Sequence, residues 1–408
     1  MFPTGVTRSS VLRERGEERL ANVTNMELFF DLVYVFTIIQ LSSHLFADLS
    51  WNGAFETGVM FLAVWWAWNY TAWATGWINP DRAPVVALMA VLMVLALVMA
   101  ASIDGAFGSR GETFAFAYVA MQVLRAGFVV WAFGGVKDVM GRNYAQLLAW
   151  SAIAGAIWIA GAFVHSHDLR LEIWVAAAVV DIAAPMHGFW LPGVASTPIN
   201  DWTLAGGHLA ERCQLVLMIA FGESVLRLGE SFADTHESVA VVIAFVLGFV
   251  LTFALWAIYF LHHAPQGAET METSVEDAAR MGRGAYAYAH AIMVAAVIVI
   301  AVAVHYAIEG PSHHAGGAFA AICLGGPALF LVGITLSKHW LGHGRVLPGV
   351  CGVIALALVG GLASFSHRIE ELIVATAVAL ALAIWALIDG RPEEARDSDA
   401  NIASIDDP

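Results

Sequence analysis

The chain contains few charged residues, and this scarcity is its most informative compositional feature. Asp, Glu, Lys and Arg make up 13% of its 408 residues, hydrophobic residues make up 59%, and the mean hydropathy is +0.72. Soluble domains carry about 25% charged residues, which cover their surface. The composition therefore excludes an ordinary soluble domain and predicts an integral membrane protein surrounded by a lipid bilayer.

Positive charge is especially scarce. The chain has 19 basic and 34 acidic residues, which gives a net charge of −15. Binding to nucleic acid draws on a basic surface that neutralises phosphates, so we expect no nucleic-acid partner. Many of the acidic residues lie in the C-terminal segment 389–408, which we predict to be a disordered cytoplasmic tail.

Cysteine is almost absent. Cys213, Cys323 and Cys351 each lie inside an apolar run, where a thiol is typical of a small buried hydrophobic side chain. Histidines occur in pairs, but no cysteine or carboxylate completes a set with metal-ligand spacing, so we predict no metal and no other cofactor. No nucleophile motif or glycine-rich phosphate loop is present, which weighs against an enzyme.

Long hydrophobic runs, in contrast, recur from end to end. A helix crosses a bilayer with about 20 apolar residues, and these runs are continuous, without the period-two alternation of a membrane barrel. The polar start of the chain, residues 1–25, predicts a cytoplasmic segment and no cleaved signal. We predict an all-α polytopic bundle of about twelve helices, near residues 26–47, 54–77, 84–103, 113–134, 146–164, 170–190, 210–230, 237–262, 282–306, 316–337, 348–365 and 369–388.

A linker rich in Pro, Gly and Asn, residues 191–207, divides the chain evenly. Residues 26–190 and 208–388 would each hold six helices, and an even number predicts parallel repeats related by an axis along the membrane normal. Each half opens with a Glu-Arg pair that precedes a carboxylate at membrane depth. These residues are Glu18, Arg19 and Asp31 in the first half, and Glu211, Arg212 and Glu223 in the second.

The basic residues predict the orientation. If the N-terminus is inside, most Lys and Arg residues in the connections fall on the cytoplasmic side, and only Arg110, Arg170, Arg227 and Arg368 fall outside. Cytoplasmic connections of membrane proteins carry the excess of Lys and Arg. We therefore predict a multi-pass protein of a bacterial inner membrane with both termini in the cytoplasm.

Several segments carry a family resemblance. The segments Glu27–Phe36, Trp65–Tyr70, Asp181–Pro185, His208–Arg212 and Ile219–Ser224 resemble the signatures of the bacterial low-temperature-requirement A (LtrA) family. The resemblance spans most of the chain and implies a bacterial inner-membrane protein, although the biochemical activity of the family is poorly defined. Cys213 and Gln214 depart from a His-Gly-like pair and Phe221 from the usual Leu, but no acidic position is affected.

Two carboxylates begin the first apolar helix. Glu27 and Asp31 are four residues apart and share one face, which Tyr34 continues. Carboxylates about 6 Å apart in a low dielectric do not both ionise readily, which suits proton binding, or cation binding with both charges present. In the alternative interpretation, Glu27 lies at the membrane interface and Asp31 pairs with an arginine to hold helices together.

Glu223 lies deeper in its helix, between Gly222 and Ser224. A charge at this depth is costly unless it is paired or faces water, so Glu223 is a candidate for an ion or solute pathway. Arg227 follows one helical turn later, and a local Glu223–Arg227 ion pair is the alternative.

Four further charged residues are candidates for charge pairing. Arg125 lies mid-helix on a stripe with Tyr118 and Gln122, so it needs a carboxylate partner. Candidates are Asp31, Glu27 and Asp181. Asp181 alternatively caps its helix or extends to the interface. Glu211 and Arg212 could serve the same pairing role in the second half.

Two neutral groups complete the candidate pathway. His290 lies within a helix beside Tyr286 and Tyr288, where a neutral imidazole can relay protons or simply be a hydrogen-bonded core residue. Asn69 shares a face with Trp65 and Trp73, and this face either lines a cavity or forms part of an interfacial aromatic belt.

These patterns favour a transporter or channel for a small solute or ion, with protons as a candidate coupling species, through acidic residues on the first helix of each half. The alternatives are a membrane-embedded enzyme that uses buried acids, and a lipid-related or stress scaffold whose charges only lock helices together. The sequence leaves the transported species open, and also whether identical chains form a homo-oligomer.

Overall fold

The structure, a computed structural model, describes residues 8–13, 23–202, 206–236, 238–274, 277–342, 344–362 and 367–389. Within these ranges the chain forms twelve main helical segments and no β-sheet, so the all-α prediction is confirmed. Glu18, Arg19 and the predicted tail beyond Asp389 lie outside the described residues.

The first half of the chain contains six helices: α1 (Asn25–Ala47), α2 (Trp51–Thr75), α3 (Ala83–Ala101), α4 (Gly111–Ala132), α5 (Val139–Ala162) and α6 (His167–Met186). The described part of the second half forms six segments, of which the second, third and fourth are composite. The six segments are α7 (Gly206–Asp234); α8 (Val239–Ala257), continued by the π-helix η5 (Ile258–His263) and α9 (Ala264–Thr273); α10 (Ala278–Met281), continued by the π-helix η6 (Gly282–Ala289) and α11 (His290–Glu309); α12 (Gly317–Cys323) with α13 (Gly325–Leu341); α14 (Leu347–Leu362); and α15 (Arg368–Asp389).

The observed boundaries lie within a few residues of the predicted ones for most segments. The α5 helix begins seven residues earlier than predicted because Asp138 caps it, accepting hydrogen bonds from the backbone N–H groups of Met140 at 2.8 Å and Gly141 at 3.3 Å. The α8 segment runs on through η5 to Thr273, since a π-helix continues the backbone hydrogen bonding where the hydropathy falls.

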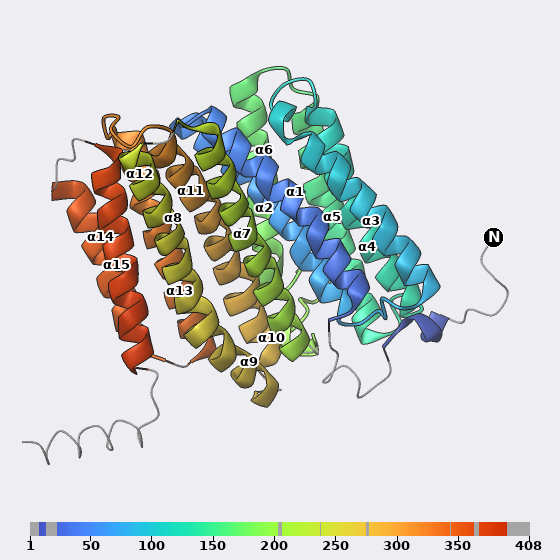
Figure 1. Cartoon of the computed structure of the whole chain (residues 1–408). Helices are drawn as coiled ribbons and strands as arrows, with labels where there is room; N and C mark the ends of the chain where they lie inside the picture. Colours follow the sequence, from blue (N-terminus) through green and yellow to red (C-terminus); the bar gives the residue numbers. More distant parts are fainter. Residues whose placement is uncertain are drawn as a thin grey trace, which may run out of the picture.

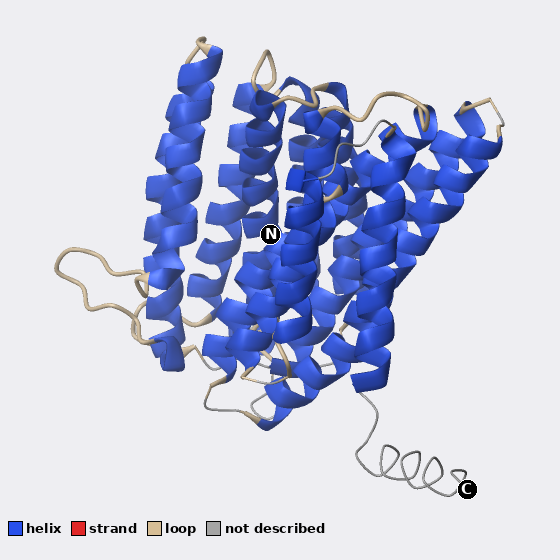
Figure 2. Cartoon of the chain, turned by 90° about the vertical axis from the view of Figure 1, so that its left-hand side faces the viewer, coloured by secondary structure: helices blue, strands red, loops and turns tan. Residues whose placement is uncertain are grey.

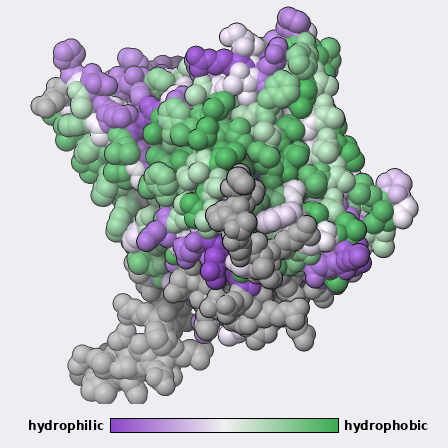
Figure 3. Space-filling model, turned by 90° about the vertical axis from the view of Figure 1, so that its right-hand side faces the viewer, coloured by the Kyte–Doolittle hydropathy of each residue, from purple (hydrophilic) through white to green (hydrophobic). Residues whose placement is uncertain are grey.

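The surface agrees with a membrane environment. Eight of the described segments are long and apolar enough to cross a membrane by length and composition. Figure 3 shows hydrophobic side chains over the middle of the molecule and hydrophilic ones gathered towards its ends. Exposed apolar residues such as Phe29, Val94 and Leu226 face outward, where lipid replaces the protein core as their apolar surroundings.

The two halves of the chain lie side by side (Figure 1), and their helices run along one direction with the loops at the two ends (Figure 2). Helices α1 and α7 meet between the halves, and α1 also packs against α2, α3 and α11. The succession of contacts α1–α3, α3–α4, α4–α5 and α5–α6 recurs as α7–α11, α11–α13, α13–α14 and α14–α15. We call the end of the bundle that carries residues 187–202 the linker face.

The cysteines do not all follow the prediction. Cys213 and Cys323 are buried, but Cys351 is exposed. It lies on α14, an edge helix that packs mainly against α13 and α15, so part of its apolar surface remains uncovered by protein. An apolar run in a membrane helix therefore does not by itself indicate burial in the protein.

Candidate functional site

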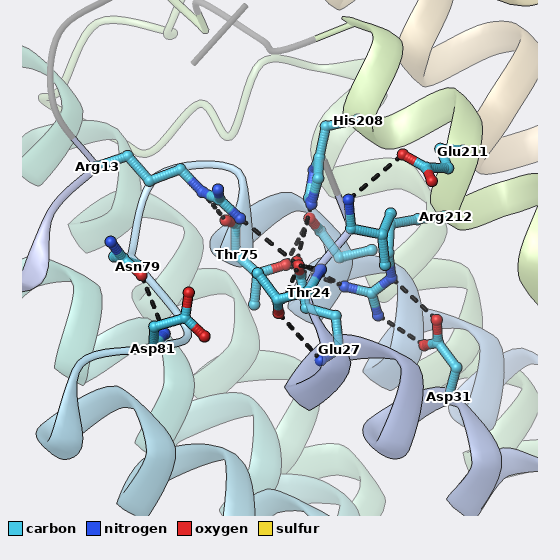
Figure 4. A network of polar contacts seen from close by, with 12 residues as sticks. Arg13, Thr24, Glu27, Asp31, Thr75, Asn79, Asp81, His208, Glu211 and Arg212 are labelled. Atoms are coloured by element: carbon cyan, nitrogen blue, oxygen red, sulfur yellow. Dashed lines mark hydrogen bonds and ion pairs between the residues drawn. The ribbon is translucent and has the colours of Figure 1, made fainter. Parts of the chain in front are cut away.

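A buried cluster of charged side chains joins the first helices of the two halves. We call it the clasp: Glu27 and Asp31 from α1, and His208 and Arg212 from α7 (Figure 4). Arg212 donates from Nε to Asp31 Oδ2 at 3.0 Å, from Nη2 to Asp31 Oδ1 at 2.6 Å, and from Nη1 to Glu27 Oε1 at 3.0 Å. His208 Nε2 lies 2.8 Å from the same Glu27 oxygen. None of the four residues is more than 3% exposed, so their charges are compensated without solvent.

Neighbouring polar groups saturate the carboxylates. From α2, Trp68 donates its Nε1–H to Asp31 Oδ1 at 2.7 Å, and Thr75 Oγ1 accepts from Arg212 at 3.1 Å. The backbone N–H of Thr24 donates to Glu27 Oε2 at 2.9 Å in the capping box that begins α1. Each carboxylate oxygen of the clasp thus has a donor. This is the arrangement expected if Asp31 pairs with an arginine to hold helices together.

The clasp fixes the register between α1 and α7. The contacts Glu27–His208 and Asp31–Arg212, and a third contact from Ser42 to Glu223, each join residues 181 positions apart, so the two helices run parallel in constant register. Asp31 is the seventh residue of α1 and Glu223 the eighteenth of α7. At 1.5 Å per residue they differ in depth by about 16 Å.

The predicted match of Asp31 with Glu223 therefore needs correction. The residues at the same level of the two helices are Asp31 with Arg212, and Ser42 with Glu223. The predicted match aligned the two halves on their Glu-Arg pairs. The described helices begin at Asn25 and Gly206, and residues that lie equally far from these two helix starts contact each other.

Glu223 forms a second polar group further along α7. Its Oε1 accepts from Ser42 Oγ at 3.0 Å and from Arg227 Nε at 3.1 Å, so the local ion pair expected as the alternative is present. Arg227 also donates to the backbone oxygen of Ile39 at 2.9 Å and to the Ser43 hydroxyl. In contrast, Glu223 Oε2 is buried and has no hydrogen-bond partner among the described residues.

Two hydroxyl groups lie on α1 between these levels. Tyr34 OH and Thr37 Oγ1 are buried and have no hydrogen-bond partner in the described part of the chain. With Asp31 before them and Ser42 after them, they form a polar stripe along α1. Chemically, this stripe offers hydroxyl groups between a saturated carboxylate and a half-paired one.

Arg125 does not pair as predicted. It is completely buried on α4, yet within the described ranges it forms no ion pair with Asp31, Glu27 or Asp181. It donates to the backbone oxygen of Ala67 at 3.2 Å, to Thr71 Oγ1 at 3.3 Å and to Gln122 Oε1. Neutral oxygens of α2 and of its own helix replace the expected carboxylate.

A chain of hydrogen bonds through two neutral side chains connects Arg125 to Asp181. Gln122 Nε2 donates to Tyr118 OH at 2.8 Å, and Tyr118 OH donates to Asp181 Oδ2 at 2.7 Å. Trp158 Nε1–H donates to the same oxygen at 2.9 Å. Asp181 is thus buried in a network rather than extended to the interface. Glu211, by contrast, is exposed and accepts from the backbone N–H of Val23, so it takes no part in the clasp (Figure 4).

His290 lies at the junction of η6 and α11. Its Nε2 is 2.6 Å from Tyr259 OH on η5, and its Nδ1 is 2.7 Å from the backbone oxygen of Ala285. A carbonyl accepts only, so Nδ1 carries the proton and Nε2 accepts from the tyrosine. The imidazole also stacks on Tyr286, with ring centroids 4.8 Å apart. The residue joins two π-helices and is fully hydrogen-bonded.

A pocket of about 350 Å³ opens near the linker face, and Asn69 lies in its wall. Helices α2, α5 and α6, the segment 187–202 and η6 build it, so both halves contribute. Aromatic side chains form much of the wall: Trp66, Tyr70, Trp73, Tyr144, Trp202 and Tyr288. The η6 segment is tied to this wall by hydrogen bonds from Trp65 Nε1 to Ala287 O, from Tyr288 OH to Ile182 O, and from Arg283 Nη1 to Pro185 O.

Only part of this pocket could be predicted from the sequence. The pattern indicated Asn69 and the Trp-rich face of α2, but not Tyr144, Trp202 or Arg283. The available signal was Trp202, an aromatic residue in a linker otherwise rich in Pro, Gly and Asn. Its ring packs against Trp73, with centroids 6.1 Å apart, so the linker folds back over α2.

Comparison with known proteins identifies the family of this chain. The family model of the bacterial low temperature requirement A protein (LtrA) matches residues 22–385. The chain belongs to the LtrA family. It is 32% identical over 361 residues to a protein of Rhizobium meliloti (strain 1021) named "Uncharacterized protein RA0937", and the match covers 88% of this chain and 87% of that protein. No solved structure matches the present chain.

Four of the five segments that carry the LtrA resemblance contribute to the clasp or to the pocket. Glu27–Phe36 and His208–Arg212 supply all four clasp residues, while Trp65–Tyr70 and Asp181–Pro185 supply pocket-lining residues from α2 and α6. Trp68 belongs to one of these segments and contacts the clasp directly. In this LtrA protein α2 therefore borders both the clasp, through Trp68, and the pocket, through Asn69.

Proposed function

We propose that this LtrA protein is a proton-linked carrier for a small organic solute, which it binds in the pocket near the linker face. The observation that carries the proposal is the pocket itself. Helical bundles normally fill such spaces with side chains, whereas ligand sites keep an apolar cavity with a few placed polar groups. Here buried polar atoms of the wall, Asn69 Nδ2, Trp73 Nε1 and Tyr144 OH, have no hydrogen-bond partner among the described residues.

The arrangement of the halves supports a carrier. Pocket and clasp both lie where the two halves meet, and carriers built from repeats work by moving one half against the other around a site between them. The recurrence of helix contacts supports the predicted duplication into 26–190 and 208–388. The π-helix η6 lines the pocket, and the π-helix η5 is joined to the end of η6 by the hydrogen bond between Tyr259 and His290. Such irregular turns are frequent at functional sites.

We assign proton coupling to Glu223. Asp31 is saturated by Arg212 and Trp68, whereas Glu223 has one carboxylate oxygen without a partner. The Tyr34 and Thr37 hydroxyls lie along the stripe that leads towards it. We assign the linker face to the cytoplasm of a bacterial inner membrane, because Arg82, Lys137 and Arg280 lie in or beside the connections at that end.

Flux into liposomes that contain the full chain tests the proposal. The probes are radiolabelled benzenesulfonate, phenylalanine and benzyltrimethylammonium, which are anionic, zwitterionic and cationic solutes of similar size. We expect at least one probe to enter faster than into empty liposomes, and an imposed pH gradient to accelerate its entry. In Glu223→Gln the entry should persist and the acceleration should disappear, because an amide does not exchange a proton at working pH.

The matched control is Glu172→Gln, which changes an exposed acid on α6 and should leave both rates unchanged. Potassium and proton fluxes, measured in the same liposomes, separate a channel from a carrier. If no probe and neither ion moves faster than in empty liposomes under any gradient, the carrier proposal fails. The scaffold alternative would then account for the saturated clasp.

A further inference from the structure

We infer that the pocket binds a small organic anion with a flat apolar body, such as a single-ring sulfonate or carboxylate. The inference concerns the substrate class of the proposed carrier, and it rests on that proposed function only for the statement that the ligand is transported. Three features of the pocket carry it: its unpartnered donors, its charge and its aromatic wall.

The unpartnered polar atoms of the wall are donors. Asn69 Nδ2 and Trp73 Nε1 are N–H groups that cannot accept a hydrogen bond, and Tyr144 OH can donate one. All three atoms are buried without a partner in the described chain, and Asn69 and Tyr144 are only 2% and 1% exposed. A buried donor without an acceptor is unfavourable, so a ligand that offers acceptor oxygens is stabilised by supplying the missing partner.

The charge of the pocket has the sign that suits an anion. Arg283 is half-buried and lines the pocket; its Nη1 donates to the backbone oxygen of Pro185, and it forms no ion pair among the described residues. No Asp or Glu belongs to the described pocket lining. Asp181 lies behind the wall, but its Oδ2 already accepts from Tyr118 and Trp158.

A second arginine lies behind the wall. The Arg125 guanidinium carbon is 5.3 Å from the centre of the Tyr70 ring, and Tyr70 lines the pocket. The hydrogen bonds of Arg125 within the described residues go to neutral oxygens, and Gln122 and Tyr118 stand between it and Asp181. A cation in the pocket would meet Arg283 directly and find no carboxylate in the lining.

The aromatic wall determines the body of the ligand. Trp66, Tyr70 and Trp73 follow one another along α2, and Trp202 and Tyr288 close the pocket from the linker and η6. Aromatic rings prefer offset or edge-to-face contacts with another ring. A cavity of about 350 Å³ lies at the lower end of ligand pockets, which suits a ligand of one or two rings.

An aromatic wall by itself would also suit a quaternary ammonium ion through cation–π contacts. The donors and Arg283 argue against this ligand, and the experiment separates the two. The purified full-length protein in detergent is titrated with benzenesulfonate, benzyl alcohol and benzyltrimethylammonium, which share the ring and differ in charge. Binding is followed by calorimetry, since the pocket tryptophans complicate fluorescence from aromatic ligands.

We expect benzenesulfonate to bind at least about tenfold more tightly than benzyl alcohol, because it adds a charge-assisted contact with Arg283. In Arg283→Gln most of this preference should be lost, with the affinity for benzyl alcohol unchanged. Asn69→Leu should weaken both ligands, because it removes a donor and fills part of the cavity. The control is Arg280→Gln, which removes an exposed arginine three residues away that pairs with Asp277, and it should change nothing.

Each variant is accepted only if its gel-filtration profile and melting temperature match those of the parent; if Asn69→Leu fails this check, the Arg283 and Arg280 pair decides. Tightest binding of benzyltrimethylammonium, or an anion preference that is undiminished in Arg283→Gln, overturns the inference. Benzenesulfonate that binds but never crosses the liposome membrane would refute the carrier and leave the site standing. Transport of another probe without benzenesulfonate binding or competition would refute the substrate class and leave the carrier standing.

Discussion

Arg212→Met is expected to prevent most of the protein from reaching a stable folded state. The substitution leaves Glu27 and Asp31, both 0% exposed, without the guanidinium that donates to them. Removing one partner of a buried ion pair costs about 3–5 kcal/mol, and a protein domain has only about 5–15 kcal/mol of net stability. The measurements are the yield of monodisperse protein after detergent extraction and its melting temperature.

Two variants show whether charge is the cause. Arg142→Met removes an exposed arginine on α5 and should leave yield and melting temperature unchanged. The triple variant Glu27→Gln, Asp31→Asn, Arg212→Met has no unpaired charge in the clasp, so it should recover much of the loss. If the melting temperature of Arg212→Met equals that of the parent, the clasp does not hold the two halves together.

Gly333→Leu should have the second-largest effect, because it forces α11 and α13 apart. A Cβ at Gly333 would lie 2.5 Å from Met293 Cγ and 3.1 Å from the backbone oxygen of Ala289. Gly326, two turns earlier on the same face of α13, meets Ile300 Cγ1 at 2.7 Å. Membrane helices associate largely through such close packing, and overpacking typically costs about 1–3 kcal/mol. We expect a lower melting temperature and a larger aggregated fraction on gel filtration.

Gly325→Leu is the matched control. Gly325 is exposed on the same helix, and a Cβ there meets no atom within 4 Å. The same residue change therefore adds the same apolar volume without a clash. Equal losses of stability in the two variants would mean that the α11–α13 contact is not responsible.

The sequence by itself determined the class and the helices of this protein. Hydropathy acts over about 20 consecutive residues, so each span could be predicted from its own residues, and α1 and α15 begin and end close to the predicted positions. The capping box at the start of α1 depends on local sequence for the same reason, since Thr24 and Glu27 are three residues apart. The Glu223–Arg227 pair, one helical turn apart, was also foreseen as an alternative.

Only the tertiary structure decided which polar groups meet. Asp31 pairs with Arg212, 181 residues away, while Arg125 pairs with no carboxylate among the described residues. Such pairing depends on the register and rotation of two packed helices, and the hydropathy of each helix carries almost no information about either. The pocket depended on the fold even more, because Trp202 and Arg283 reach α2 only once the linker and η6 have packed against it. The sequence determined that acids lie at membrane depth, and helix packing determined that one pair is saturated and Glu223 only half-paired.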